Sequence, residues 1–299
     1  MAIGGLPYEM AVLGDSVLWG SGLSEDDKCW SLVRRWVEQR LGRPVHVQVL
    51  AHSLAGIAPD AAKDPDSPAW GEIRFRHPSI TYQVLSDPRM KAPAPPSIDL
   101  VLVDGGINDL GPLNLFFPWH SPRWVREEAA EHCGRKMKNL LLPLLDTFTK
   151  ARVVVTGYYP LVSGQTWFVR ALAPVPRLRT RLVDLSAEWR RASEEWLQWA
   201  VHQANLHVSA SPVPRVLYAN ADFRPENCYG APDTYLWTLK EAFTDWSAVG
   251  RRRRCECIRQ KPWDPICPID MAFHPNPKGA RAYAASVTKI LEPVLPAAR

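Results

Sequence analysis

The sequence predicts a three-layer α/β/α fold built on a central parallel β-sheet of about five strands. Two observations lead to this prediction. Short apolar runs rich in β-branched residues recur along the chain, and stretches with helical periodicity lie between them. Strands that alternate with helices form βαβ units, in which the sheet is parallel and is covered by helices on both faces. The chain has 299 residues, of which 46% are hydrophobic and 22% charged, so it can bury a large core.

Five segments are expected to form the strands of this sheet. The run at 98–103 (IDLVLV) is almost entirely apolar, which is typical of a strand buried on both faces. The segment 45–50 (VHVQVL) alternates and is β-branched. The other strands are predicted at 9–13, 152–156 and 215–219.

Four segments have the periodicity of amphipathic helices. In 26–41, large apolar residues recur at helical spacing, and Gly42 is the expected C-cap. Pro277 stands near the start of the last helix, which is predicted at 278–291. Helices are also expected at 127–149 and 182–206.

The whole chain, 1–299, is predicted to form a single domain with irregular insertions near 57–97 and 220–269. The first insertion is rich in Pro, Asp and Ala, and the second holds four of the six cysteines. We find no internal repeat, so a repeat architecture is not expected.

The charge balance argues against a nucleic-acid partner. The chain has 36 Lys and Arg and 31 Asp and Glu, which gives a net charge of +5 at pH 7. The one dense basic run, 251–254, is interpreted as a solvated loop. No apolar run approaches the ~20 residues that cross a bilayer, so no integral membrane segment is expected. Nothing in the sequence implies a protein partner.

The cysteines bear on the compartment. An even number is compatible with disulfides, and three of the six lie within 255–267. We expect at least two disulfides, with Cys255, Cys257 and Cys267 among the partners. The N-terminal residues as given are not a signal peptide. The protein is therefore either cytoplasmic or the mature form of a secreted or periplasmic protein, and the cysteines favour the second. Their spacing fits no common zinc pattern, so no metal and no cofactor are expected.

Four polar motifs occupy the positions where a parallel sheet binds its ligands. The carboxyl ends of parallel strands meet at one edge of the sheet, and ligands bind in the crevice outside that edge. Three of the motifs follow the first three predicted strands, and the fourth precedes the last helix. They are GDS at 14–16, HSLAG at 52–56, GIND at 106–109 and FHPN at 273–276.

These motifs contain the groups that acyl transfer needs. A serine hydroxyl is a poor nucleophile until a base takes its proton, and Ser16 and His274 are the candidates for these two roles. The tetrahedral intermediate carries a negative charge on oxygen, which preorganised donors stabilise by roughly 3 kcal/mol each. The backbone N–H groups of Ser16 and Gly56 and the side-chain amide of Asn108 are the candidate donors of this oxyanion hole. Each motif alone is commonplace, and their order and placement together predict a site.

The four motifs make the chain similar to the SGNH (GDSL) hydrolase family of esterases and lipases. They occur in the order of the family's blocks and span 13–284, nearly the whole chain. The resemblance implies a flavodoxin-like three-layer α/β/α fold and hydrolysis of esters or thioesters without a metal. It also implies the roles given above for Ser16, Gly56, Asn108 and His274.

The chain departs from the family pattern at one position. The family usually has an aspartate three residues before the histidine, where this chain has Met271; Asp270 lies four residues before it. Two acceptors for the second ring nitrogen of His274 remain open: the Asp270 carboxylate, or the Met271 backbone carbonyl as in family members that use a Ser-His dyad. We favour Asp270 as the third catalytic residue, because a carboxylate also stabilises the imidazolium that forms during attack.

The expected activity is hydrolysis of a small-molecule or lipid ester through an acyl-enzyme on Ser16. A thioesterase, a phospholipase or a carbohydrate deacetylase would use the same site, and a noncatalytic binding module of the same fold is the alternative from another class. Asp15 and Asp109 are interpreted as structural. For the aromatic stretch 113–119 and for Trp19, two interpretations remain open: they line the acyl pocket or a lid, or they pack into the core.

Overall fold

The computed structural model describes residues 6–59, 79–87, 97–208, 213–244 and 271–297. In this part of the chain, five parallel strands form one sheet, in the order β2-β1-β3-β4-β5. This confirms the predicted three-layer α/β/α fold. The strands are β1 Tyr8–Leu13, β2 Val45–Val49, β3 Leu100–Val103, β4 Arg152–Thr156 and β5 Val216–Ala219.

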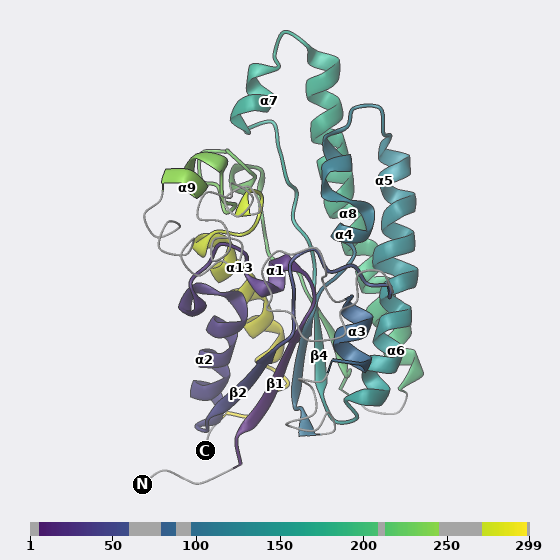
Figure 1. Cartoon of the computed structure of the whole chain (residues 1–299), viewed down its shortest axis with the longest axis vertical. Coiled ribbons are helices and arrows are strands. Elements are labelled where there is room, and N and C mark those ends of the chain that lie inside the picture. The colour runs from purple at the N-terminus through teal and green to yellow at the C-terminus, as the bar shows by residue number, and fades with distance from the viewer. Residues whose placement is uncertain (1–5, 60–78, 88–96, 209–212, 245–270, 298–299) are drawn as a thin grey trace.

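The helices lie on both faces of the sheet (Figure 1). The α-helices are α1 Ser16–Trp19, α2 Cys29–Leu41, α3 Ile80–Leu85, α4 Ile107–Leu110, α5 Pro122–Ala129, α6 Met137–Thr147, α7 Trp167–Ala171, α8 Pro176–His207, α9 Leu239–Thr244 and α13 Pro277–Leu291. The described residues also form the short 3₁₀ turns η1 Glu25–Asp27, η4 Pro112–Phe116 and η6 Pro225–Asn227, and a π-helical turn, η5 Ala130–Lys136. Helices α2 and α13 pack together against one face, and α3, α6 and α8 cover the other. None of the described helices is both long enough and apolar enough to span a membrane.

The strand order places the candidate site. The chain reverses its direction across the sheet between β1 and β3, which are neighbours although β2 separates them in sequence. In open parallel sheets the ligand crevice forms at such a switch point, outside the carboxyl ends of the strands. The segments that follow β1 and β3 are those with the GDS and GIND motifs.

Helix α2 begins later than predicted and ends where predicted. The turn η1 and Lys28 occupy the expected first residues of the helix. At its other end, Gly42 adopts a left-handed conformation with φ of 64° and donates its N–H to the Glu38 carbonyl. This is the geometry that favours glycine after the last helical turn.

Two other helices begin earlier than predicted. The helix predicted at 127–149 starts at Pro122, after Ser121 accepts a hydrogen bond from the Trp124 N–H at 3.0 Å, and continues through η5 to the end of α6. The helix predicted from 182 begins at Pro176. The first turns of α8 are mostly exposed. They lack the apolar stripe from which a helix is recognised in sequence.

The expectation of at least two disulfides is wrong. Cys29, Cys133 and Cys228 are buried free thiols. The other three cysteines, Cys255, Cys257 and Cys267, lie outside the described residues and can form at most one disulfide among themselves. The three free thiols come from different parts of the fold: the start of α2, the turn η5 and the residue after η6. Burial raises the pKa of the Cys29 thiol to about 12, so it stays protonated at neutral pH.

Candidate active site

A glycine and a glutamine shape the turn that carries Ser16. Gly14 has φ of +136°, and a Cβ at this position would overlap the Asp104 carboxyl group, so only glycine fits. The Gln83 side chain, from α3, holds both backbone groups of Gly14. It accepts from the Gly14 N–H at 2.7 Å and donates to the Gly14 carbonyl at 3.0 Å.

Two buried aspartates form the floor of this turn. Asp15 caps α1 by accepting from the Val17 N–H at 2.8 Å, and its second oxygen accepts from the Tyr158 hydroxyl at 2.7 Å. Asp104, the first residue after β3, accepts from the backbone N–H groups of Asp15 at 2.7 Å and Leu18 at 3.1 Å. The polar groups around Ser16 are therefore paired by neighbours that do not contact its hydroxyl.

The two buried carboxyl groups belong to adjoining parts of this turn, since Asp104 accepts from the backbone N–H of Asp15 itself. Burial raises the pKa of Asp104 well above its ordinary value, and the charge of Asp15 raises it further. Burial raises the pKa of Asp15 too, but the hydrogen bond from Tyr158 opposes this. Burial and the neighbouring Asp15 charge thus favour the protonated form of Asp104, which avoids two adjacent buried charges.

His274 is positioned by a backbone ladder to a neighbouring loop. Its carbonyl accepts from the Trp237 N–H at 2.8 Å, the Phe273 N–H donates to the Trp237 carbonyl at 3.0 Å, and the Asn276 N–H donates to the Tyr235 carbonyl at 2.8 Å. Asn276 then caps α13 with its side chain. The loop is tied down on both sides of the histidine.

The structure brings Ser16 and His274 into direct contact. The Ser16 Oγ lies 2.7 Å from the His274 Nε2. If this nitrogen accepts the hydroxyl proton, a neutral imidazole carries its own proton on Nδ1. Asp270, the predicted partner of that nitrogen, lies outside the described residues. The alternative acceptor, the Met271 carbonyl, already accepts the backbone N–H of His274 at 3.1 Å.

The three candidate oxyanion donors are available. Among the described residues, the backbone N–H groups of Ser16 and Gly56 donate to no other group. One N–H of the Asn108 amide donates to the Ala55 carbonyl at 3.1 Å, which fixes the side chain and leaves its second N–H available. This bond also ties Asn108 to the loop that carries Gly56.

Asp109 holds this loop in place. Its carboxylate accepts from the Ile57 N–H at 2.9 Å and from the Lys136 ammonium at 3.1 Å. A Cβ on Gly56 would lie 3.4 Å from the same carboxylate. Asp109 is almost fully buried and pairs with these groups, away from the Ser16 hydroxyl.

Ser16, Asn108 and His274 line a cleft with a volume of about 480 Å³, which is within the range of small-molecule sites. Gly56 is not among its lining residues, although Leu54 is. Most of its wall is apolar: Val17, Leu54, Ile107, Leu113, Phe116, Leu161, Trp189, Leu239, Ala272 and Phe273.

The two interpretations explain the aromatic stretch 113–119 only in part, since Phe117 and Trp119 neither line the cleft nor pack into the core: they are 37% and 70% exposed. Phe116 lines the cleft and packs on Phe273 with ring centroids 5.1 Å apart. Phe117 instead stacks on Trp119 at 4.5 Å, outside the cleft. Trp19 does not line the cleft; its ring lies 3.7 Å beneath the buried ammonium group of Lys28.

Several residues of this site lie outside the four motifs and were not predicted from the sequence. The position of Asp104 in the sequence could have marked it as a site residue, because it directly follows the buried strand β3, just as Gly14 directly follows β1. No such feature marks Gln83, since it lies in the stretch interpreted as an irregular insertion. Tyr158 and Trp189 also line the cleft, and no motif marks them.

Solved structures with the same fold are known. Comparison with protein-family models found no match, and neither did comparison with curated protein sequences. An extracellular lipase from Streptomyces rimosus superposes with a TM-score of 0.55 at 13% identity, covering 96% of this chain and 100% of the lipase. A lipase from a goat rumen metagenome gives 0.54 at 13% identity, covering 94% of this chain and 96% of that one. Phospholipase A1 from Streptomyces albidoflavus superposes with a TM-score of 0.52 at 15% identity, covering 96% of this chain and 99% of the phospholipase.

The chain therefore shares its fold with these two lipases and this phospholipase, which agrees with the three-layer α/β/α fold predicted from the sequence. At these sequence identities the likeness establishes the fold, and the argument for activity rests on the site itself.

Proposed function

We propose that this protein is a carboxylic ester hydrolase that works through an acyl-enzyme on Ser16. The observation that carries the proposal is the 2.7 Å contact between the Ser16 Oγ and the His274 Nε2 in the wall of an apolar cleft. A noncatalytic binding module has no need of a serine and a histidine paired in this way, with unengaged hydrogen-bond donors beside them.

The proposed reaction begins when His274 takes the hydroxyl proton of Ser16 as Oγ attacks the ester carbonyl carbon. The carbonyl oxygen becomes an oxyanion, and it accepts from the N–H groups of Ser16 and Gly56 and from the free N–H of Asn108. His274 then gives its proton to the leaving alcohol. A water molecule repeats the sequence on the acyl-enzyme, with His274 again as base, and releases the acid.

We propose that Asp270 orients His274 and stabilises the imidazolium. The Met271 carbonyl is the competing acceptor, and it could take the ring N–H as well as the His274 backbone N–H, because a carbonyl oxygen has two lone pairs. A carboxylate favours the positive charge that develops on the imidazole, which a neutral carbonyl does less well.

The cleft favours an ester with an apolar acyl chain. Its polar members are few, and two of them are already bonded: the Tyr158 hydroxyl donates to Asp15, and the Tyr159 hydroxyl to the Phe273 carbonyl. A sugar ring would leave its hydroxyl groups without partners against this wall, at a cost in binding free energy. A hydrocarbon chain would gain from burial instead.

The first prediction is that kcat/KM rises with acyl chain length. On p-nitrophenyl esters from acetate upward, each methylene buried in the cleft contributes about 0.8 kcal/mol, or up to about fourfold. The increase is expected to end when the chain fills the cleft. Phe116→Ala removes part of the cleft wall and should make kcat/KM depend less steeply on acyl chain length. Phe168→Ala, outside the cleft, is the matched control and should leave this dependence unchanged. A steady fall from acetate onward would contradict an acyl cleft and favour a deacetylase.

The second prediction concerns Asn108. Asn108→Ala is expected to lower kcat by roughly 10²- to 10³-fold with little change in KM, because its free N–H acts mainly on the transition state. Asn114→Ala is the control, since Asn114 lies in the same cleft and its amide donates to the Leu110 carbonyl at 2.7 Å. It should cause a much smaller loss. If Asn108→Ala changed KM alone, Asn108 would be a ground-state binder and the proposed oxyanion hole would be wrong.

A further inference from the structure

The segment 160–183 contains four arginines and no acidic residue. It covers α7 and the first turns of α8, which reach beyond the carboxyl ends of the strands at the same end of the molecule as α1 (Figure 1). Among the described residues, Arg170, Arg177 and Arg179 form no ion pair. Arginines farther along the same helix do, as in the pair between Arg191 and Glu188. With a net charge of only +5 on the chain, this is a local excess of positive charge.

Large apolar side chains are exposed among these arginines. Trp167 is 64% exposed and Val175 49%, and Trp119, the residue after Pro118, is 70% exposed. Exposed apolar side chains that gather in one region of a protein surface commonly mark an interaction site. We name the set Trp119, Trp167, Arg170, Val175 and Arg177 the basic–apolar surface.

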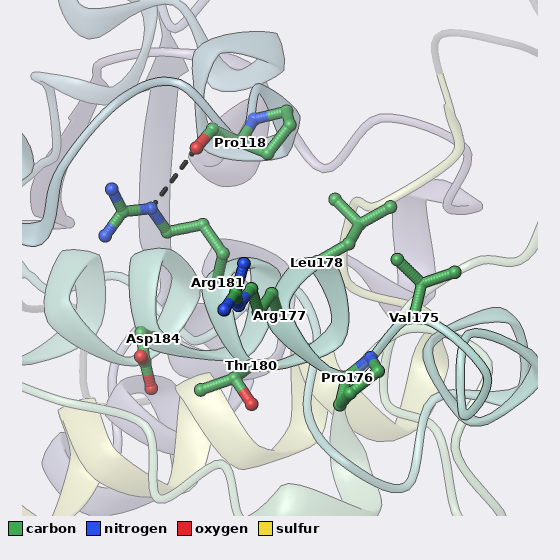
Figure 2. Close-up of a pocket in the computed structure, with 8 residues that line it drawn as sticks. All are labelled: Pro118, Val175, Pro176, Arg177, Leu178, Thr180, Arg181 and Asp184. Atoms are coloured by element: carbon green, nitrogen blue, oxygen red, sulfur yellow. Dashed lines mark hydrogen bonds between the residues drawn. The ribbon is translucent and has the colours of Figure 1, made fainter.

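This surface borders a hollow with a volume of about 750 Å³ (Figure 2). On one side lie the Arg177 and Arg181 side chains on α8, and on the other lies Pro118. The Arg181 Nε donates to the Pro118 carbonyl at 3.2 Å and joins the two sides. Asp184 is the one acidic residue that lines the hollow.

The hollow lies close to the mouth of the catalytic cleft along the chain. Phe116 is a wall of the cleft, and Pro118, two residues later, is a wall of the hollow. Leu113, in the same segment, lines the cleft and is 68% exposed. The segment 113–118 therefore links the wall of the cleft to the hollow that the basic–apolar surface borders.

We propose that the basic–apolar surface docks the protein on an anionic lipid surface, so that the ester substrates are presented at an interface. The inference rests on the proposed function and names its substrate class. Arginines attract acidic headgroups, and tryptophans and aliphatic side chains enter the boundary between headgroups and acyl chains. A polysaccharide fits this surface less well, because Thr180 is the one neutral hydrogen-bonding side chain that lines the hollow, beside Val175, Leu178 and two prolines.

The test is co-sedimentation of the full chain with vesicles of phosphatidylglycerol and phosphatidylcholine in equal parts, compared with phosphatidylcholine alone. The protein is expected to bind the anionic vesicles and to be released by salt, which screens the attraction. The double variant Arg170→Gln, Arg177→Gln should bind about 25-fold more weakly, because each cation near such a surface contributes about fivefold.

The control is the double variant Lys150→Gln, Lys289→Gln, which loses the same charge. Lys150 precedes β4 and Lys289 lies near the end of α13, so both are at the opposite end of the sheet. It should bind as the wild type does. Both double variants should hydrolyse the soluble ester p-nitrophenyl acetate at the wild-type rate, which keeps this test separate from that of the proposed function.

Three results would overturn the proposal. One is equal binding to the two kinds of vesicle, or none to either. Another is an equal loss of binding in both double variants, which would reflect net charge alone. The third is retention on insoluble acetylated xylan without binding to vesicles, which would make the surface a polysaccharide site.

Discussion

Replacing Ser16 with alanine is expected to lower ester turnover by about 10⁴- to 10⁶-fold, because the variant keeps only the catalysis that binding and the oxyanion hole supply. The fold should be preserved. The turn around Ser16 is held by Gly14, Asp15 and Asp104, and none of their hydrogen bonds uses the Ser16 hydroxyl. The only hydrogen bond of that hydroxyl among the described residues is to His274.

The measurement is kcat on a p-nitrophenyl ester, together with thermal unfolding of the same preparation. Ser21→Ala is the matched control. Ser21 is a buried serine five residues further along the chain, and its Oγ lies 2.9 Å from the Ser53 Oγ. It should keep turnover near the wild-type value. A Ser16→Ala enzyme with more than about a tenth of wild-type activity would exclude Ser16 as the nucleophile.

Replacing Asp270 with asparagine is expected to lower kcat by about 10⁴-fold, the loss that follows when the aspartate of a triad is neutralised. The substitution keeps the shape of the side chain and removes its charge. Without the carboxylate, the tautomer that leaves Nε2 free to accept the serine proton is no longer favoured, and the imidazolium loses its counter-charge. KM should change little, because Asp270 would act through His274 and not on the substrate.

Asp233→Asn provides the control for this experiment. Asp233 pairs with Lys278, which lies at the start of α13, four residues after His274. Asp233 has no role in the proposed reaction. Its neutralisation should leave kcat near the wild-type value. A loss below about tenfold in Asp270→Asn would instead identify a Ser-His dyad, with the Met271 carbonyl as the acceptor for His274.

The strands were the part of the fold that could best be predicted from the sequence. The strand predicted at 152–156 coincides with β4, and the others differ from the structure by one or two residues at an end. Short β-branched runs bounded by turn residues are local signals, so strands can be recognised from them without knowledge of the tertiary structure. Helix α3 lacked such a signal, because it has only six residues inside a stretch rich in Pro and Ala.

Residues that act through distant partners could not be predicted. Gln83 holds Gly14 across 69 residues of sequence, and Asp104 holds the same turn across 89. Neither pairing leaves a pattern in a single sequence. The disulfide prediction failed for a related reason: an even number of cysteines says nothing about their distances, and Cys29, Cys133 and Cys228 are packed separately in the core.

The most direct test of Ser16 as the nucleophile is the site at which a fluorophosphonate probe labels the protein. The probe reacts with a serine that an adjacent base has activated. After digestion and mass spectrometry, we expect one adduct, on Ser16, which is absent from Ser16→Ala and forms much more slowly in His274→Ala. An adduct on a different residue, or ester hydrolysis by protein that the probe does not label, would contradict this assignment.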